Sequence, residues 1–420
     1  MPRKTRQRKI FNVALFRFLA LLAAIAWGSN LHAATTVKKK KKAPVKTAAG
    51  AAKPTAKTAA VHRQPVRTPV QTAALSLRPV HPATMTAVAR RSSAKKLTGV
   101  WRVPTYADST EGDFIDGDDL VVRRAAVDAL GPLNGSVVVT DPTTGRVLTI
   151  VNQKLAYQSG YQPCSTVKIP VALAALSEGV IDRQTLVRVY GRTKFDMTSA
   201  LAKSNNQYFA NLGERLGFDR VSYYAKLFGL GEKAGLDIEG EQAGLLTPVE
   251  PKSGVGMMTS FGDGISMTPL EFAALMGAVA NGGTLYYLQY PKTQAEAAEM
   301  MPRVKRRLDI DQVIPDIKPG MMGAVEYGTA RRIGFDPNEP VYGKTGTCTD
   351  SRTPTHLGWF GSFAESSGNK LVVVVLLTGG RPDSGPAASG VAGAFYKSLG
   401  LSTYFATQAH QLSPSWMINN

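Results

Sequence analysis

The sequence is poor in the residues on which several large enzyme classes depend. It has two cysteines and five histidines, and only His356 and His410 lie beyond the first 97 residues. No His-Glu-x-x-His motif or paired Cys/His spacing of a zinc site is present, and no Gly-x-Ser-x-Gly serine accompanies His356. Walker and Rossmann glycine patterns are also missing. Zinc hydrolases, histidine-dependent serine hydrolases and common nucleotide-binding enzymes are therefore disfavoured, and we expect neither a metal nor a cofactor.

Acidic residues are missing from the first 97 positions, which carry 21 Lys and Arg. The net charge of +19 would by itself suggest a nucleic-acid-binding protein. However, the other 29 basic residues accompany all 31 acidic ones, so residues 98–420 sum to about −2. A basic arm thus precedes a near-neutral globular part, and any affinity for polyanions belongs to the arm. We expect no nucleic-acid partner.

Residues 1–34 have the pattern of an export segment. Basic residues at positions 3–9 precede an apolar run at 10–27 that only Arg17 interrupts. The part after Arg17 has about the length of a signal-peptide core, and the alanines at 33–34 fit a cleavage site. The whole run is also just long enough for an uncleaved membrane anchor. Under either alternative the rest of the chain is exported, to the periplasm or to the outer face of the cytoplasmic membrane.

Residues 35–97 are dominated by Ala, Thr, Pro, Val and Lys, with an unbroken lysine run at 38–42. The prolines prevent long helices, and the segment has too few large apolar side chains to build a core. We therefore expect a disordered, extended linker. It is either a solvated spacer or an electrostatic contact to anionic envelope polymers or lipid headgroups.

Residues 98–410 are expected to form a single catalytic domain. A β-hairpin is predicted at 135–151, around the turn residues Asp141-Pro-Thr-Thr-Gly145. Apolar segments and their end signals predict helices at 166–178, 267–280, 320–332 and 390–399. Strands predicted at 341–349, 356–365 and 370–378 follow one another without a helix between them. This order favours an α/β (α+β) fold with an antiparallel sheet flanked by helices, and not a βαβ repeat.

A serine hydrolase without histidine needs another base, and Ser165-Thr-Val-Lys168 offers one. At positions i and i+3 of a helix, the Lys168 amine lies on the same face as the Ser165 hydroxyl. The start of a helix favours an alkoxide and an oxyanion. Burial and a second cation nearby would lower the pKa of Lys168 and make it a base. The spacing alone is weak, because Ser92 and Ser93 begin the same pattern in the linker.

A second motif, Ser204-Asn-Asn206, follows a short helical stretch at 197–203. The Ser204 hydroxyl would relay a proton, and the Asn206 amide would hold a substrate carbonyl. Such a tripeptide alone is more typical of a helix cap or a turn.

A third motif, Lys344-Thr345-Gly346-Thr347, opens a predicted strand. Its lysine and threonines would bind a substrate carboxylate, and Gly346 would let the strand edge approach the nucleophile. The Thr347 N–H would point at the reacting carbonyl, and Lys344 would be the cation that lowers the pKa of Lys168. Alone, this motif is also typical of an edge-strand turn.

In this order, the S-x-x-K, S-x-N and K-T-G motifs resemble the active site of penicillin-binding proteins and serine β-lactamases. Further segments resemble the D,D-transpeptidase domain of penicillin-binding proteins, so that the resemblance covers about residues 130–400. These segments are 199–209, 229–237, 262–270 and 326–330, whereas 161–173 resembles the nucleophile helix of both class B penicillin-binding proteins and class D β-lactamases. The resemblance implies a penicillin-binding transpeptidase / β-lactamase-like fold, an antiparallel sheet between an all-helical lobe and terminal helices.

The resemblance also implies a serine acyltransferase that acts on the D-alanyl-D-alanine stem peptides of peptidoglycan. Ser165 would attack the peptide carbonyl with Lys168 as general base, and Ser204 would pass the proton to the leaving amine. The backbone N–H groups of Ser165 and Thr347 would form the oxyanion hole. An amine of a second stem peptide (D,D-transpeptidase) or water (carboxypeptidase) would then take the acyl group. β-Lactams would acylate Ser165 as substrate mimics.

Two alternatives stay open at this point. A serine β-lactamase would differ only in letting water cleave the acyl-enzyme quickly. A β-lactam sensor would be acylated without turnover and would need a signalling domain, which residues 1–97 do not contain. The sequence also departs from its relatives: Asn206 stands where a class D β-lactamase carries an apolar residue, and the interval from Ser165 to Ser204 is short. No Glu-x-x-Leu-Asn segment offers the deacylation base of a class A enzyme.

The two cysteines flank two of the motifs. Cys164 precedes Ser165 and Cys348 follows Thr347, so the two thiols are expected on opposite walls of one cleft. An exported protein can oxidise them, and carbapenem-hydrolysing class A β-lactamases are bridged at the same two positions. We predict a Cys164–Cys348 disulfide; the alternative is two small buried thiols.

Overall fold

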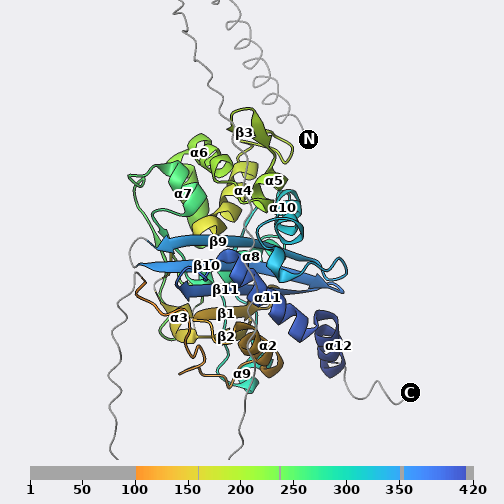
Figure 1. Ribbon diagram of the computed structural model, residues 1–420. Helices are drawn as coiled ribbons and strands as arrows, with labels where there is room; N and C mark the ends of the chain where they lie inside the picture. Colours follow the sequence, from red (N-terminus) through yellow and green to blue (C-terminus); the bar gives the residue numbers. More distant parts are fainter. Residues whose placement is uncertain (1–100, 159, 236–237, 351–353, 413–420) are drawn as a thin grey trace, which may run out of the picture. The chain divides into compact units, whose positions relative to one another are not determined.

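The computed structural model describes residues 101–158, 160–235, 238–350 and 354–412 (Figure 1). The predicted export segment and the linker lie outside these residues. Within the described ranges, no helix combines the length and the apolar character that crossing a membrane requires.

A five-stranded antiparallel sheet forms the centre of the domain, in the order β2-β1-β11-β10-β9 (Figure 1). Its strands are β1 (Gly135–Thr140), β2 (Val147–Val151), β9 (Val341–Asp350), β10 (Thr355–Ser366) and β11 (Asn369–Gly379). The three C-terminal strands pair as consecutive hairpins, so that Gly361 of β10 lies between Lys344 and Val374. The predicted antiparallel sheet is confirmed, and β9 is one of its two edges.

Helices cover both faces of the sheet, which is why its strands are apolar almost throughout. One face carries α2 (Leu120–Leu130), α11 (Gly385–Leu399) and α12 (Leu401–Leu412), and α8 (Pro269–Ala280) lies against the other. Successive residues of β11 point to opposite sides: Val373 belongs to the apolar cluster with α2 and α11, and Val374 to the cluster with α8. Every residue of α8 is buried, as expected for a helix that is apolar all round.

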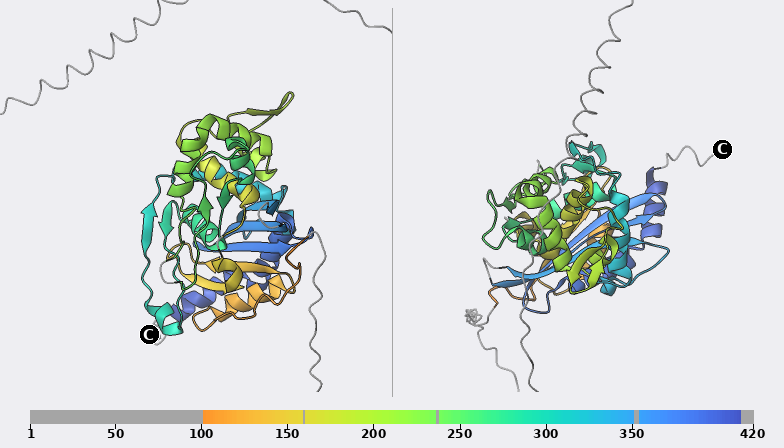
Figure 2. Two further views of the ribbon diagram at one scale, coloured as in Figure 1. Left: turned by 90° about the vertical axis from the view of Figure 1, so that its left-hand side faces the viewer. Right: turned by 90° about the horizontal axis from the view of Figure 1, so that it is seen from above.

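An all-helical lobe lies beside the β9 edge (Figures 1 and 2). It consists of the 3₁₀ turn η1 (Cys164–Val167), α4 (Lys168–Ser177), α5 (Met197–Ala202), α6 (Asn206–Leu227), α7 (Val255–Phe261) and α10 (Ile314–Glu326), with a hairpin of β3 (Val187–Tyr190) and β4 (Thr193–Phe195). Residues 168–176 of α4 are all buried, because this helix runs through the middle of the lobe.

Short elements complete the domain. They are α3 (Gln153–Tyr157), β5 (Leu245–Leu246), β6 (Ile265–Ser266), β7 (Thr284–Tyr286), α9 (Gln294–Glu299), β8 (Val304–Arg307) and η2 (Arg331–Ile333). β5 pairs with β6, and β7 with β8, both antiparallel.

Two predicted helix boundaries were wrong. The helix predicted at 320–332 is α10, which begins at Ile314 and ends at Glu326, with Pro319 inside it. Proline removes only one helical hydrogen bond, and packing of α10 on α5 tolerates that loss. After Glu326 the chain turns and passes close to the end of α5, where a Cβ on Gly328 would lie 2.1 Å from the Ala202 oxygen. The last predicted helix begins at Gly385 rather than at 390, because Ser384 caps it.

Candidate active site

Ser165 lies in the tight turn η1, immediately before α4. The chain enters this turn through Cys164, whose φ of 53° is unusual for a residue with a side chain. The Thr166 hydroxyl donates to the Pro163 oxygen at 2.6 Å and fixes the turn from within. Ser165 is half-buried and stands at the positive end of α4.

The Lys168 side chain reaches Ser165 from one helical turn away and is fully buried. Its Nζ lies 3.0 Å from Ser165 Oγ, 2.8 Å from the Ser204 backbone oxygen and 3.2 Å from Ser204 Oγ. It also contacts Asn206 Oδ1 at 2.5 Å and lies 5.6 Å from the centre of the Phe209 ring. The predicted nucleophile, base, relay hydroxyl and amide are therefore brought together around one amine.

Lys344 approaches the same Ser204 hydroxyl from β9. Its Nζ lies 2.8 Å from Ser204 Oγ, and its side chain is also fully buried. Burial lowers the pKa of Lys344 to about 7. Burial, and secondly the charge of Lys344, lower the pKa of Lys168 well below its ordinary value. Both effects favour the uncharged amine of Lys168, which is the form that can accept a proton.

The β9 edge faces the nucleophile turn at close range. A Cβ on Gly346 would lie 2.9 Å from the Pro163 oxygen, so only glycine lets the strand approach this turn so closely. The Thr345 oxygen accepts from Lys344 Nζ and therefore points away from β10. Backbone groups alternate sides along a strand, so the Thr347 N–H two residues on also points out of the sheet, toward the cleft.

The Thr345 and Thr347 hydroxyls lie on the other face of β9 from Lys344. Thr347 Oγ1 accepts from the Gly385 N–H at 2.8 Å, at the start of α11. Thr345 Oγ1 lies 2.6 Å from the hydroxyl of Thr329. Lys344 therefore pairs with Ser204, and the two threonine hydroxyls have other partners.

Thr329 is a residue that the motifs did not single out. It follows α10, its hydroxyl contacts Thr345, and its N–H donates to the Ala202 oxygen at 3.2 Å. It thus ties β9 to the segment that carries Ser204. The only sequence signal was its place in 326–330, which resembles the transpeptidase domain without a role for each residue.

Cys164 and Cys348 are joined by a disulfide with Cα atoms 5.6 Å apart. This separation lies in the usual range for a disulfide. Lys344, Gly346 and Cys348 share one face of β9 by the period of two, and the bridge links that face to the residue before Ser165. It closes a loop with a sequence separation of 184.

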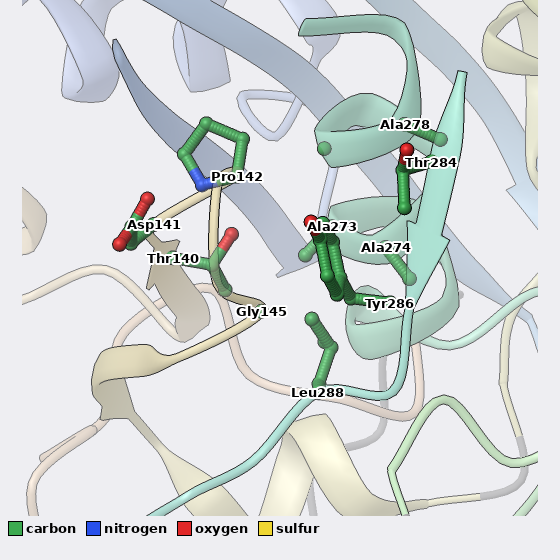
Figure 3. A pocket seen from close by; sticks show the side chains of 11 residues that line it. Thr140, Asp141, Pro142, Gly145, Ala273, Ala274, Ala278, Thr284, Tyr286 and Leu288 are labelled. Atoms are coloured by element: carbon green, nitrogen blue, oxygen red, sulfur yellow. The ribbon is translucent and has the colours of Figure 1, made fainter. Parts of the chain in front are cut away.

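Other candidate sites in the described part of the domain have fewer reactive groups. Figure 3 shows a pocket of about 10 Å³ between the β1–β2 turn and α8. The Asp141 carboxylate at this pocket accepts hydrogen bonds from the hydroxyls of Thr143 and Thr144. His356 contacts Thr349 and the Trp101 ring. Among the residues that the structure describes, no group of three or more His, Cys, Asp or Glu could hold a metal ion.

Known protein families include one that matches this chain. The model of the penicillin-binding protein transpeptidase domain matches residues 135–399. Stage V sporulation protein D of Bacillus subtilis is 30% identical over 284 residues, which are 59% of this chain and 44% of that protein. Peptidoglycan D,D-transpeptidase MrdA of Haemophilus influenzae is 26% identical over 352 residues, 64% of this chain and 54% of that protein. The chain thus spans about half the length of these relatives.

Solved structures show the same fold. Pseudomonas aeruginosa PBP2, in complex with WCK 5153, has a TM-score of 0.56 and 25% identity over 67% of this chain and 74% of that chain. PBPA from Mycobacterium tuberculosis has a TM-score of 0.55 and 23% identity over 67% of this chain and 81% of that chain.

Proposed function

Because the chain belongs to the family of penicillin-binding protein transpeptidase domains, we propose that it is a peptidoglycan D,D-transpeptidase that forms an acyl-enzyme on Ser165. Its substrate is the D-alanyl-D-alanine end of a stem peptide. The observation that carries the proposal is the contact chain from Ser165 through Lys168 and Ser204 to Lys344. These contacts supply a nucleophile, a base whose pKa is lowered, and a hydroxyl that can relay a proton.

Acylation begins when the Ser165 oxygen attacks the peptide carbonyl and Lys168 takes the hydroxyl proton. The lowered pKa of Lys168 supports this role, because a charged ammonium could not accept the proton. Ser204 Oγ lies between the two lysine nitrogens, at 3.2 Å and 2.8 Å. It can therefore pass a proton to the departing D-alanine amine, and the second stem peptide's amine later uses the same route in reverse.

The substrate's carboxylate and carbonyl are held at the β9 edge. The Thr347 N–H and the Ser165 N–H form the oxyanion hole, as supported by the outward direction of the Thr347 backbone. Thr345 and Thr347 receive the terminal carboxylate beside the start of α11, whose positive end favours an anion. Lys344 approaches from the other face of β9, beside Ser204, and a positive charge on it would attract the carboxylate toward this edge. Asn206 holds the peptide carbonyl next to Lys168.

Residues 1–97 support the further proposal that the domain works outside the cytoplasm. The basic and apolar pattern of 1–34 is that of an export segment, and the linker at 35–97 carries cations suited to anionic envelope polymers. N-terminal sequencing of the protein from envelope fractions distinguishes cleavage near 33–34 from a retained anchor. A chain found only in the cytoplasm would contradict the proposal.

Covalent labelling with a fluorescent penicillin tests the assignment of the nucleophile. Ser165→Ala is expected to abolish labelling, whereas Ser177→Ala, at the exposed end of the same helix, is expected to retain it. Labelling of the Ser165 variant would contradict the proposal. The lifetime of the penicilloyl-enzyme then separates a transpeptidase, with hours, from a β-lactamase, with milliseconds to seconds.

A further inference from the structure

The hairpin of β3 and β4 projects from the helical lobe at the end away from the sheet (Figure 1, and Figure 2, left). Its inner face packs on the lobe through Val187 and Val189, which are buried, and α6 lies against β3. Lys203 lies 5.2 Å from the centre of the Phe195 ring. The hairpin is therefore anchored on one side, and its other side is exposed.

The outer face of the hairpin alternates apolar and basic side chains. Leu186, Arg188 and Tyr190 share this face by the period of two, and Leu186 and Tyr190 are 60% and 64% exposed. Lys194 of β4 stands directly opposite Arg188, and opposite residues of paired strands share a face. Two exposed apolar side chains, Leu186 and Tyr190, thus flank Arg188, and Lys194 lies beside it on the next strand.

The charge of this hairpin is uncompensated. Residues 183–195 contain four basic residues and no acidic one. None of the four forms an ion pair with an acidic side chain among the described residues. The flanking carboxylates are engaged elsewhere: Asp182 accepts from Gln184 N and Thr185 Oγ1, and Asp196 caps α5.

Like charges that face each other across two strands destabilise the hairpin. Both side chains are exposed, so packing does not require a basic residue at either position. An anionic partner would remove the repulsion between Arg188 and Lys194 and bind both at once.

We propose that the outer face of the β3–β4 hairpin docks on an anionic lipid surface. Basic side chains contact lipid phosphates, and a tyrosine with a neighbouring leucine suits the boundary between headgroups and acyl chains. A soluble polyanion would use the cations but would gain nothing from Leu186 and Tyr190. The two exposed apolar side chains on the cationic face therefore favour a membrane over a polymer.

Vesicle binding by the full-length protein tests this docking, with each variant compared with the native chain at the same salt concentration so that the contribution of the basic residues at 1–97 is common to both. Partition is measured by co-sedimentation on vesicles of phosphatidylglycerol and phosphatidylcholine, with pure phosphatidylcholine as the reference. Each basic residue near an anionic surface contributes about 1 kcal/mol, or about fivefold in affinity. The double variant Arg188→Ser/Lys194→Ser is thus expected to lose about 25-fold on the anionic vesicles.

Two further double variants separate this surface from general charge effects. Arg124→Ser/Lys397→Ser removes two exposed cations from α2 and α11 and is expected to change binding less than twofold. Leu186→Ser/Tyr190→Ser is expected to weaken vesicle binding about tenfold and to leave binding to soluble polyphosphate unchanged. Labelling of Ser165 by fluorescent penicillin checks that each variant is folded.

The proposal is overturned if the Arg124/Lys397 pair matters as much as the hairpin pair, because binding would then follow net charge. It is also overturned if Leu186→Ser/Tyr190→Ser leaves vesicle binding intact and Arg188→Ser/Lys194→Ser weakens binding to polyphosphate as much as binding to vesicles. That second result would assign the surface to a soluble polyanion.

Discussion

Two pairs of basic residues lie close together in two regions of this molecule, and the pairs differ in their exposure to solvent. In the cleft, Lys168 and Lys344 are fully buried and both contact Ser204. On the hairpin, Arg188 faces Lys194, and both are exposed. Burial penalises charge, so the pKa values of both buried lysines fall. The exposed pair lies in water, where salt screens its electrostatic interactions.

The comparison shows that the environment, and not the residue type, decides what a pair of cations does. Inside the cleft, burial favours the uncharged form of both lysines, which is the form that can accept a proton. On the hairpin, both side chains lie in water and are accessible to a partner. Substitutions in the two pairs should therefore differ in kind and in size.

Lys168→Ala should have the largest effect. The variant loses the base that is poised on Ser165, so the second-order rate of acylation by a β-lactam is expected to fall by about 10³-fold or more. Stopped-flow acylation with a fluorescent penicillin measures this. Lys194→Ala is the matched control on the hairpin and should acylate at the native rate. Near-native acylation of the Lys168 variant at neutral pH would mean that another residue is the base.

Removal of the disulfide should have the second largest effect. The bridge joins the turn before α4 to β9, the two elements that carry Lys168 and Lys344. The bridge closes a loop with a separation of 184, and loss of such a bridge costs about 2–5 kcal/mol of unfolding free energy. Cys164→Ala/Cys348→Ala should show this loss in urea unfolding and become insensitive to reductant. An unchanged unfolding midpoint would mean that the bridge does not constrain the chain.

Lys344→Met should shift the pH dependence of acylation. The charge of Lys344 helps to lower the pKa of Lys168, so its removal raises that pKa. Acylation requires uncharged Lys168, and the midpoint of its rise with pH is therefore expected to move upward, by about one pH unit. The maximal rate also falls, because the carboxylate loses a partner. Arg188→Met should leave the midpoint unchanged; an upward shift there too would mean that distant charges set it.

Lys344→Met also tests how the free energy of unfolding depends on pH. A lysine whose pKa is lowered on folding binds fewer protons in the folded state than in the unfolded state, so stability rises with pH. For Lys344 this rise should span about pH 7 to 10.5, and unfolding of Lys344→Met across that range should show a weaker pH dependence than the native protein. An equal slope would indicate that Lys344 is not the group responsible.

Lys194→Glu should have the smallest effect. It turns the repulsive pair with Arg188 into an attractive one and is expected to stabilise the fold by about 0.2–1 kcal/mol at low salt. The gain should disappear in about 1 M salt, where the screening length is only about 3 Å. Thermal unfolding at two salt concentrations measures it. A gain that persists in high salt would point to packing instead of charge.

Several features could be read from the order of residues because they depend on local chemistry. The spacing of Ser165 and Lys168 fixes their relation within one helical turn, and the strand period puts Lys344 and Cys348 on one face. Strands that follow one another without a helix between them pair readily as antiparallel hairpins, so the pairing of β9, β10 and β11 could be predicted. The pairing of β1 with β11 joins distant segments, and no local pattern predicted it. Helix α6 was not predicted, because its pattern is mixed and Gly217 interrupts it with a non-helical backbone.

Other features depend on contacts between distant segments, which no local pattern encodes. Lys344 meets Ser204 across 140 residues. Burial lowers the pKa values of both lysines, and the charge of Lys344 lowers that of Lys168 further. Thr329 reaches Thr345 only because α10 packs on α5. The sequence by itself determined which groups could react and which face of each element they occupy. Tertiary packing decided which of them are dry, and desolvation is what turns a lysine into a base.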